Sequence, residues 1–311
     1  MAHMSSLPKS FKFSKEVATA RRAGKPLVAL ESTVITHGLP QGVNLDLART
    51  MEDVVRAEGA TPATIAVLDG RICVGLEADE LARLANDKQV RKLSTRDLAA
   101  ALVDKTSGGT TVAATLRVAA LAGIRAFATG GIGGVHRGSN WDISADLPEL
   151  ASQAVLLVCA GAKAILDLEA TLEQCETRGI PVLGYQTDEF PAFYSIQSGL
   201  PVSARVDTPQ DAAALARAHW ELGGSGLLLA APPPAESALP KAEVEAWIAQ
   251  ALLEAEAQGL RGQPVTPYLL SRVNELSEGK SMEANLALLK NNARIAGQAA
   301  RYLTNHKTKS A

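Results

Sequence analysis

The sequence is poor in the features that mark several large classes of protein. Its 311 residues include only three cysteines, Cys73, Cys159 and Cys175, and none of them stands in a CxxC pair. This scarcity excludes a disulfide scaffold and a thiolate zinc site, and it is typical of a reduced cytosolic protein. No apolar run approaches the length of a membrane span, and no secretory signal opens the chain. We therefore expect a soluble, cytoplasmic protein.

An excess of charge of either sign is also missing. Lys and Arg number 31, Asp and Glu number 33, and the net charge is −2. A chain so balanced gives no electrostatic case for binding nucleic acid or an anionic membrane. Hydrophobic residues make up 47% and charged residues 21%, which predicts a sizeable core and little disorder.

Short apolar runs alternate with helical patterns along the chain, which is typical of parallel βαβ units. Consecutive prolines in "APPPAES" (231–237) separate this part from a helical tail, which runs from Thr266 to about Leu303 and is punctuated at "SEGKS" (277–281). We predict a three-layer α/β/α fold with a mainly parallel sheet and a helical C-terminal portion. Strands are expected at Leu27–Leu30, Ala63–Leu68, Ile72–Val74, Ala126–Thr129, Ala154–Cys159, Pro181–Tyr185 and Gly226–Ala230. Helices are expected to begin near Asn44 (as an N-cap), Thr95, Thr111, Ala164, Thr208 and Lys241.

The domain organisation predicted from these patterns is simple. Residues 1–10 are expected to form a disordered N-terminal tail, in which "MAH" before Met4 resembles a cloning remnant. Residues 11–306 are expected to form a single domain.

Polar residues gather at the predicted carboxyl ends of four strands, where parallel sheets bind ligands. These stretches are "LEST" (30–33), "TGGIGGVHRGSNWDISADL" (129–147), "CAGAK" (159–163) and "GYQTDEFPAF" (184–193). Glu31 in the first is a candidate acid/base, although a surface or cap role fits it equally well. The second is no dinucleotide fingerprint, because His136 replaces the third glycine and no helix pattern follows.

Three further features could serve an anionic ligand, and each has an ordinary alternative. "SGGTTVAAT" (107–115) opens a helix at Thr111, which suits a phosphate but also describes a common capped loop. Asp142 and Asp146 offer oxygen ligands for Mg²⁺ or Mn²⁺, or they are solvated loop acids. Lys92 is a possible phosphate partner or an exposed lysine beside Arg91.

Lys163 is the most informative single residue. It follows the apolar run Val155–Ala160 and precedes a helical pattern, expected over Ala164–Arg178, whose positive end would favour an uncharged amine. A neutral lysine can form a Schiff base with a carbonyl carbon. The alternative is a lysine whose ammonium reaches water along an apolar stem.

Taken together, these stretches resemble the pseudouridine-5′-phosphate glycosidase family, which includes the indigoidine synthase A-like proteins. The resemblance runs in order from "PLVALESTVITHGLP" through "GGTTVAAT", "FATGGIGGVHRG", "DISADLPELA" and "VCAGAKAILD" to "TPYLLSRVNELSEGKSMEANLALLKNNA". It implies reversible cleavage of the C–C glycosidic bond of pseudouridine 5′-phosphate, giving uracil and ribose 5-phosphate. It also implies a homotrimer with one Mn²⁺ per subunit.

The resemblance also assigns roles to residues. Lys163 would be the nucleophile, Glu31 the general acid/base, and Asp142 the metal ligand. Substrate would be bound by Lys92, Val112, Ser144, Ala145, Asp146, His136 and Asn285.

Two departures from the family pattern stand beside these matches. "APPPA" (231–235) replaces an Asn-Pro-Ile-Pro-Glu run, and the loop between His136 and Asp142 is shorter.

Two other functions compete with this hypothesis. One is a Schiff-base aldolase that acts on another sugar phosphate, and the other is a phosphosugar-binding regulatory protein without turnover.

Overall fold

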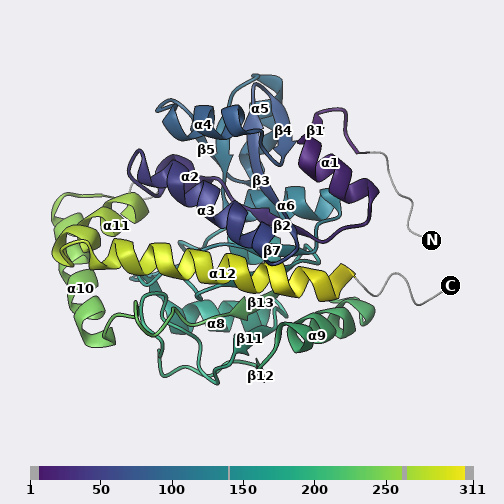
Figure 1. Ribbon diagram of the computed structural model, residues 1–311. Coiled ribbons are helices and arrows are strands. Elements are labelled where there is room, and N and C mark those ends of the chain that lie inside the picture. Colours follow the sequence, from purple (N-terminus) through teal and green to yellow (C-terminus); the bar gives the residue numbers. More distant parts are fainter. Residues whose placement is uncertain (1–6, 139–140, 261–264, 305–311) are drawn as a thin grey trace.

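The computed structural model describes residues 7–138, 141–260 and 265–304 (Figure 1). Its centre is an 11-stranded sheet in which most neighbours run parallel, with the path β1-β4-β3-β2-β7-β9-β13-β11-β12. Strand β3 is antiparallel to β4 and to β6, and β6 pairs with β5 beside this path. The strands are β1 (Phe11–Phe13), β2 (Leu27–Leu30), β3 (Thr61–Leu68), β4 (Arg71–Val74), β5 (Arg91–Leu93), β6 (Gly108–Thr110), β7 (Ala126–Ala128), β9 (Leu156–Cys159), β11 (Val182–Tyr185), β12 (Ala204–Val206) and β13 (Leu227–Ala230).

Helices cover both faces of this sheet, and a two-stranded ribbon lies beside it. The ribbon pairs β8 (Val135–His136) with β10 (Leu166–Asp167). The helices are α1 (Lys15–Arg22), α2 (Thr33–His37), α3 (Val43–Ala57), α4 (Ala78–Asn86), the 3₁₀ turn η1 (Thr95–Asp97), α5 (Leu98–Val103), α6 (Val112–Ala122), α7 (Asp146–Leu150), α8 (Leu168–Thr177), α9 (Pro209–Glu221), α10 (Lys241–Ala257), α11 (Val265–Leu276) and α12 (Lys280–Thr304).

The long helix α12 crosses the front of the sheet in Figure 1, with α3 above it and α9 below it. It packs on β2, β7 and β9, so the C-terminal helical portion covers the centre of the sheet. Leu288, Leu289 and Ala296 are among the residues that α12 buries. The predicted helical tail is confirmed, and it is an integral layer of the fold.

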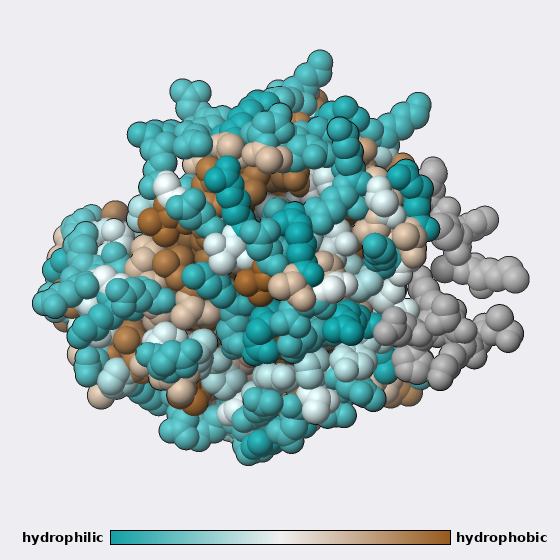
Figure 2. All heavy atoms as spheres, in the orientation of Figure 1, coloured by the Kyte–Doolittle hydropathy of each residue, from teal (hydrophilic) through white to brown (hydrophobic). Residues whose placement is uncertain are grey.

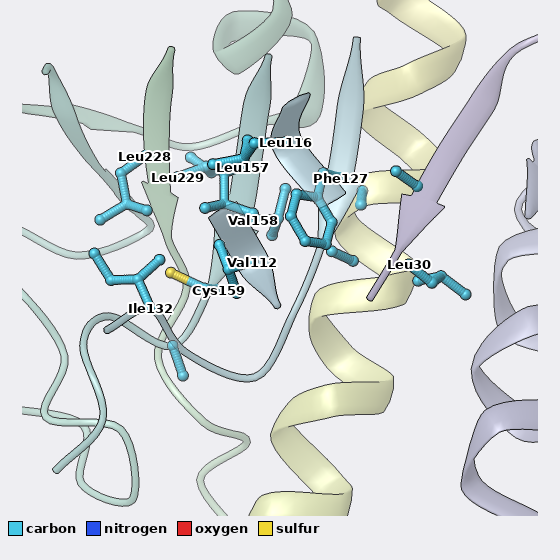
Figure 3. Packing of buried hydrophobic residues seen from close by; sticks show 14 of the residues in the cluster. Leu30, Val112, Leu116, Phe127, Ile132, Leu157, Val158, Cys159, Leu228 and Leu229 are labelled. Atoms are coloured by element: carbon cyan, nitrogen blue, oxygen red, sulfur yellow. The ribbon is translucent and has the colours of Figure 1, made fainter. Parts of the chain in front are cut away.

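The core fills the space between the central strands and the helices that cover them. Each central strand is buried almost throughout, as its run of aliphatic residues predicts. Figure 3 shows Phe127 of β7, Leu157 of β9 and Leu116 of α6 packed together, with Leu228 and Leu229 of β13 beside them. The face seen in Figure 2 is mainly hydrophilic, with hydrophobic residues gathered over the region of α2 and α3.

Comparison with the expected elements confirms the fold class and all seven predicted strands, with shifts of one or two residues at several ends. Thr111 caps α6, since its side chain accepts a hydrogen bond from Ala114 N. The predicted cap at Asn44 is wrong, because Asn44 lies inside α3 and donates to the carbonyls of Ile35 and Ala85.

The predicted tail of residues 1–10 lies partly outside the described residues. Within its remainder, the Ser10 carbonyl accepts a hydrogen bond from Ile72 N at 2.9 Å. None of the helices in the described ranges has the length and apolar composition needed to cross a membrane.

Candidate active site

The three central strands β2, β7 and β9 are parallel neighbours, so their carboxyl ends meet at one edge of the sheet. Glu31 directly follows β2, Thr129 directly follows β7, and Lys163 comes four residues after β9. The chain thus brings a carboxylate, a hydroxyl and an amine together from three distant segments. The predicted clustering of polar residues at strand ends is confirmed for these stretches.

Lys163 stands in a turn that differs from the expected one. Its backbone N–H donates to Ile132 O at 3.0 Å, and its carbonyl accepts from Leu166 N at 2.9 Å. The helix predicted from Ala164 begins only at Leu168, with Asp167 as its N-cap, because residues 166–167 pair with β8 instead. The expectation that a helix N-terminus lies at Lys163 is therefore wrong. Lys163 itself is half-buried.

Glu31 is buried, and its surroundings favour the protonated carboxyl. Burial raises the pKa of the Glu31 carboxyl, while the charge of Lys163 and the hydrogen bond from Thr129 oppose part of that rise. Thr129 Oγ1 donates to Glu31 Oε1 at 2.8 Å. A carboxyl whose pKa is raised holds its proton to higher pH than an ordinary carboxyl, which favours a role as a general acid.

Helix α12 fixes the strand end that carries Thr129. Asn292 of α12 is fully buried, and its Nδ2 donates to Thr129 O at 2.8 Å. This bond joins residues 163 positions apart in the chain. The C-terminal layer therefore holds the hydroxyl that contacts the candidate acid.

A polar wall faces these groups from the N-terminus of α6. Asp146 Oδ1 accepts from Ala113 N at 2.9 Å, and its Oδ2 accepts from Gly133 N at 2.8 Å. Asp146 thereby ties the first turn of α6 to the glycine-rich loop after β7. Both of its carboxylate oxygens are engaged, so its predicted contact with substrate stays a prediction.

Lys92 comes from β5 and supplies a further positive charge. Its side chain reaches into the cleft although the residue is exposed overall, and desolvation there, followed by the charge of Lys163, lowers its pKa. Desolvation, followed by the charge of Lys92, likewise lowers the pKa of His37. Two lysines that act on one another across a cleft favour a multiply charged anion between them.

The cleft has two compartments that share Glu31, Thr33, Lys92, Lys163 and Thr266. The polar compartment, of about 310 Å³, is lined by Val112, His136, Asp142, Ser144, Ala145 and Asp146, among others. The apolar compartment, of about 80 Å³, is lined by Gly130, Gly131, Phe193, Leu289 and Asn285, among others. All ten predicted site residues thus line this one cleft, while their individual roles remain predictions.

Sequence reasoning did not single out several residues of the cleft, among them Thr129, Thr33 and Phe193, although these three lie in the quoted stretches. Thr129 could have been found as the first polar residue after a buried strand. Thr33 lines both compartments, and its buried Oγ1 has no hydrogen-bond partner within the described ranges. Phe193 has a φ of 61°, which is rare for a bulky residue, and no sequence signal announces it.

The glycine-rich loop allows Phe193 to close the apolar compartment. A Cβ on Gly131 would lie 2.7 Å from the Phe193 ring and 3.0 Å from Gly161 O. Only a residue without a side chain fits there. The aromatic ring therefore forms a wall directly beside the strand ends.

The donor set can be tested against the predicted Mn²⁺. Within the described ranges, no three His, Cys, Asp or Glu side chains are grouped as a metal cage. Asp142 and Ser144 nevertheless line the polar compartment with hard oxygen atoms. A small hard cation such as Mn²⁺ can be coordinated by one carboxylate, with water and substrate phosphate as the other ligands. The residues present therefore fit an open, water-rich metal site.

Comparison with known proteins gives a consistent result. The chain is 55% identical to a pseudouridine-5′-phosphate glycosidase of Herpetosiphon aurantiacus, over 92% of this chain and 95% of that protein. It is 53% identical to the protein of that name from Deinococcus radiodurans, over 92% of each chain.

Two solved structures share the fold. An indigoidine synthase A-like protein from Thermotoga maritima superposes with a TM-score of 0.86 at 35% identity, covering 94% of this chain and 96% of that one. The prealnumycin C-glycosynthase AlnA, in complex with ribulose 5-phosphate, gives 0.90 at 39%, covering 97% and 100%. A model of the indigoidine synthase A-like proteins matches residues 16–302. The chain therefore belongs to the indigoidine synthase A-like family.

Proposed function

We propose that this protein cleaves the C–C glycosidic bond of pseudouridine 5′-phosphate, reversibly, to uracil and ribose 5-phosphate. The observation that carries the proposal is the meeting of Lys163 and buried Glu31 on a cleft with one polar and one apolar compartment. The names of the relatives support the substrate, and AlnA supports carbon–carbon chemistry on a sugar phosphate in this fold.

The two compartments divide the substrate between them. The 5′-phosphate and ribose occupy the polar compartment, where Lys92 and the N-terminus of α6 provide positive potential. Uracil occupies the apolar compartment against Phe193. The anomeric carbon C1′ then lies over Lys163, which lines both compartments.

Covalent catalysis solves the problem that carbon is a poor leaving group. The Lys163 amine attacks C1′ while the bond from C1′ to the ring oxygen breaks, and Glu31 gives that oxygen a proton. The Glu31 carboxylate then takes a proton from the nitrogen, which frees the nitrogen lone pair. That lone pair forms an iminium as the bond from C1′ to uracil C5 breaks, and C5 takes up the proton from Glu31. Water adds to the iminium, ribose 5-phosphate leaves, and the Lys163 amine is restored.

Asp142 is the residue that would hold Mn²⁺, one per subunit, in the polar compartment. When bound, the ion neutralises part of the phosphate charge. Asp146 lines the same compartment and is the alternative ligand, and its two hydrogen bonds from backbone N–H groups hold its carboxylate in place. We also propose a homotrimer in the cytoplasm, which size-exclusion chromatography with light scattering and cell fractionation would test.

The covalent step predicts a trappable adduct on one lysine. Sodium borohydride added with ribose 5-phosphate should reduce the imine and place the phosphosugar on Lys163 in a peptide mass map. Lys163→Ala should neither trap sugar nor cleave substrate. An adduct on Lys92 or Lys105, or turnover by Lys163→Ala, would move the nucleophile elsewhere.

Removal of the metal ligand gives a separate prediction. Asp142→Ala should abolish tight Mn²⁺ binding, measured by calorimetry on the metal-free protein, together with most activity. Asp142→Glu, which keeps a carboxylate, should retain part of both. A Mn²⁺ titration that is unchanged in Asp142→Ala would contradict the assignment.

A further inference from the structure

A third cavity adjoins the apolar compartment on the side of α11 and α12. Its volume is about 220 Å³, and we call it the outer cavity. It shares with the apolar compartment the lining residues His37, Gly38, Pro267, Leu270 and Asn285. The two spaces are therefore neighbours that share part of their lining. Lys163, Glu31 and Lys92 do not line the outer cavity.

The geometry of the substrate sets which atoms face this space. Uracil is joined to C1′ through C5, and C1′ must lie at Lys163 for the proposed reaction. Both ring nitrogens are then on the part of the base directed away from Lys163. With uracil in the apolar compartment, as proposed above, that part would be directed toward Asn285 and His37, which line both spaces. N1 and N3 point in different directions, and with N1 on the side of those residues a group attached to N1 would extend toward the outer cavity.

The lining of the outer cavity defines the chemistry of that group. Leu39, Leu270 and Met282 offer apolar contact, and Ser271 and Asn274 offer hydrogen bonds. No Lys, Arg, Asp or Glu stands among the described residues that line it. A buried charge without a partner would be costly there, so the cavity suits an uncharged alkyl or hydroxyalkyl group.

We propose that the outer cavity is a subsite for an uncharged substituent on a ring nitrogen of the base. The protein would then cleave N-alkylated pseudouridine 5′-phosphates as well as pseudouridine 5′-phosphate. This inference rests on the proposed function. The alkyl group takes no part in the bond changes: the same C1′–C5 bond breaks, C5 gains a proton, and N-alkyluracil leaves.

The test compares kcat/KM for pseudouridine 5′-phosphate with kcat/KM for its N1-methyl and N1-propyl derivatives. The unaltered protein should cleave all three within about tenfold of one another, since each methylene in a roomy apolar site changes the rate modestly. Ser271→Trp places bulk in the outer cavity from an exposed position on α11. It should lower kcat/KM for the N1-propyl substrate, relative to the unsubstituted one, by more than about tenfold.

Glu283→Trp is the matched control, because it adds the same side chain at an exposed position of α12 that lines neither the cleft nor the outer cavity. Its ratio of the two kcat/KM values should equal that of the unaltered protein. Cleavage of pseudouridine 5′-phosphate without cleavage of the N1-methyl derivative would overturn the inference and leave the proposed function intact. An unchanged ratio in Ser271→Trp would also overturn it. Absence of turnover on pseudouridine 5′-phosphate itself would refute both.

Discussion

The two compartments of the cleft are built by different physical means. In the polar compartment, charged side chains are fixed by backbone groups, as in the two N–H bonds that hold Asp146 and in the capping box between Ser94 and Asp97. In the apolar compartment, a carboxyl is buried and an aromatic ring is held against a glycine. The polar compartment is organised to hold an anion, whereas Glu31, which lines both compartments, is buried at a cost that raises its pKa.

This contrast implies a division of labour. In the proposed function, residues of the polar compartment would contact a phosphate that is unchanged by the reaction, so they should influence substrate affinity. Glu31 meets atoms whose bonds break, so it should influence the catalytic step. Measurements of kcat and KM for variants of these residues can therefore support or contradict the proposed division between affinity and catalysis.

Among the variants that test this division of labour, Glu31→Gln should have the largest effect. Glu31→Gln removes the proton donor, so kcat should fall by about 10²–10⁴ while KM changes little. The folded protein should become more stable at neutral pH, because a carboxyl with a raised pKa in the folded state costs stability as pH rises from its ordinary pKa through the raised one. Steady-state kinetics and thermal unfolding at pH 5 and pH 7.5 measure both.

The stability gain of Glu31→Gln should shrink at pH 5, where less of the unfolded-state carboxyl is ionised. A fall in stability at both pH values would instead make Glu31 a structural residue. A kcat within severalfold of the unaltered protein would remove Glu31 from the mechanism.

A smaller effect, on the other kinetic parameter, is expected at Lys92. Lys92→Gln removes a charge-assisted contact to phosphate, which is worth about 1.5–3 kcal/mol, so KM should rise roughly tenfold to a hundredfold. In the unaltered protein, KM should rise at alkaline pH earlier than an ordinary lysine would allow, because the pKa of Lys92 is lowered.

Lys88→Gln, at an exposed residue outside the cleft, is the control for the loss of one positive charge. It should leave KM unchanged. A Lys92→Gln variant with reduced kcat and normal KM would place Lys92 in the catalytic step and end the division between the compartments.

Much of the fold and the cleft could be predicted from local sequence. Aliphatic runs identify the central strands, because a strand buried on both faces needs apolar residues throughout. The rule that ligands bind at the carboxyl ends of parallel strands then predicts that Glu31 and Lys163 lie at one edge of the sheet. Thr111 was recognisable as a cap because threonine precedes a clear helical run.

The errors arose where distant contacts override a local pattern. The apolar spacing after Lys163 continues a helical period, yet residues 166–167 pair with β8 and delay α8 to Leu168. Asn44 has the chemistry of a cap, but it bonds to Ile35 and Ala85 across the fold. The bond from Asn292 to Thr129 and the position of Phe193 likewise depend on packing that no single segment encodes.

The smallest effect should come from the hydroxyl that contacts Glu31. Thr129 donates to Glu31 and thereby favours the ionised carboxyl, so Thr129→Val should raise the pKa of Glu31 further. Because Glu31 acts as an acid, activity falls as pH rises through its pKa, and the alkaline limb of the kcat/KM profile should move to higher pH. The loss at the optimum should be about tenfold or less, as one hydrogen bond allows.

Thr129→Ser keeps the hydroxyl, so the alkaline limb of its kcat/KM profile should match that of the unaltered protein. This result would separate the hydrogen bond to Glu31 from the packing of residue 129 at the end of β7. Asn292→Leu provides a second approach, since Asn292 holds the Thr129 carbonyl from α12. It should move the alkaline limb in the same direction as Thr129→Val, and the double variant should move it no further than Thr129→Val alone, because both act through one hydroxyl. A limb that moves to lower pH in Thr129→Val, or additive shifts in the double variant, would show that Glu31 is tuned by other neighbours of the apolar compartment.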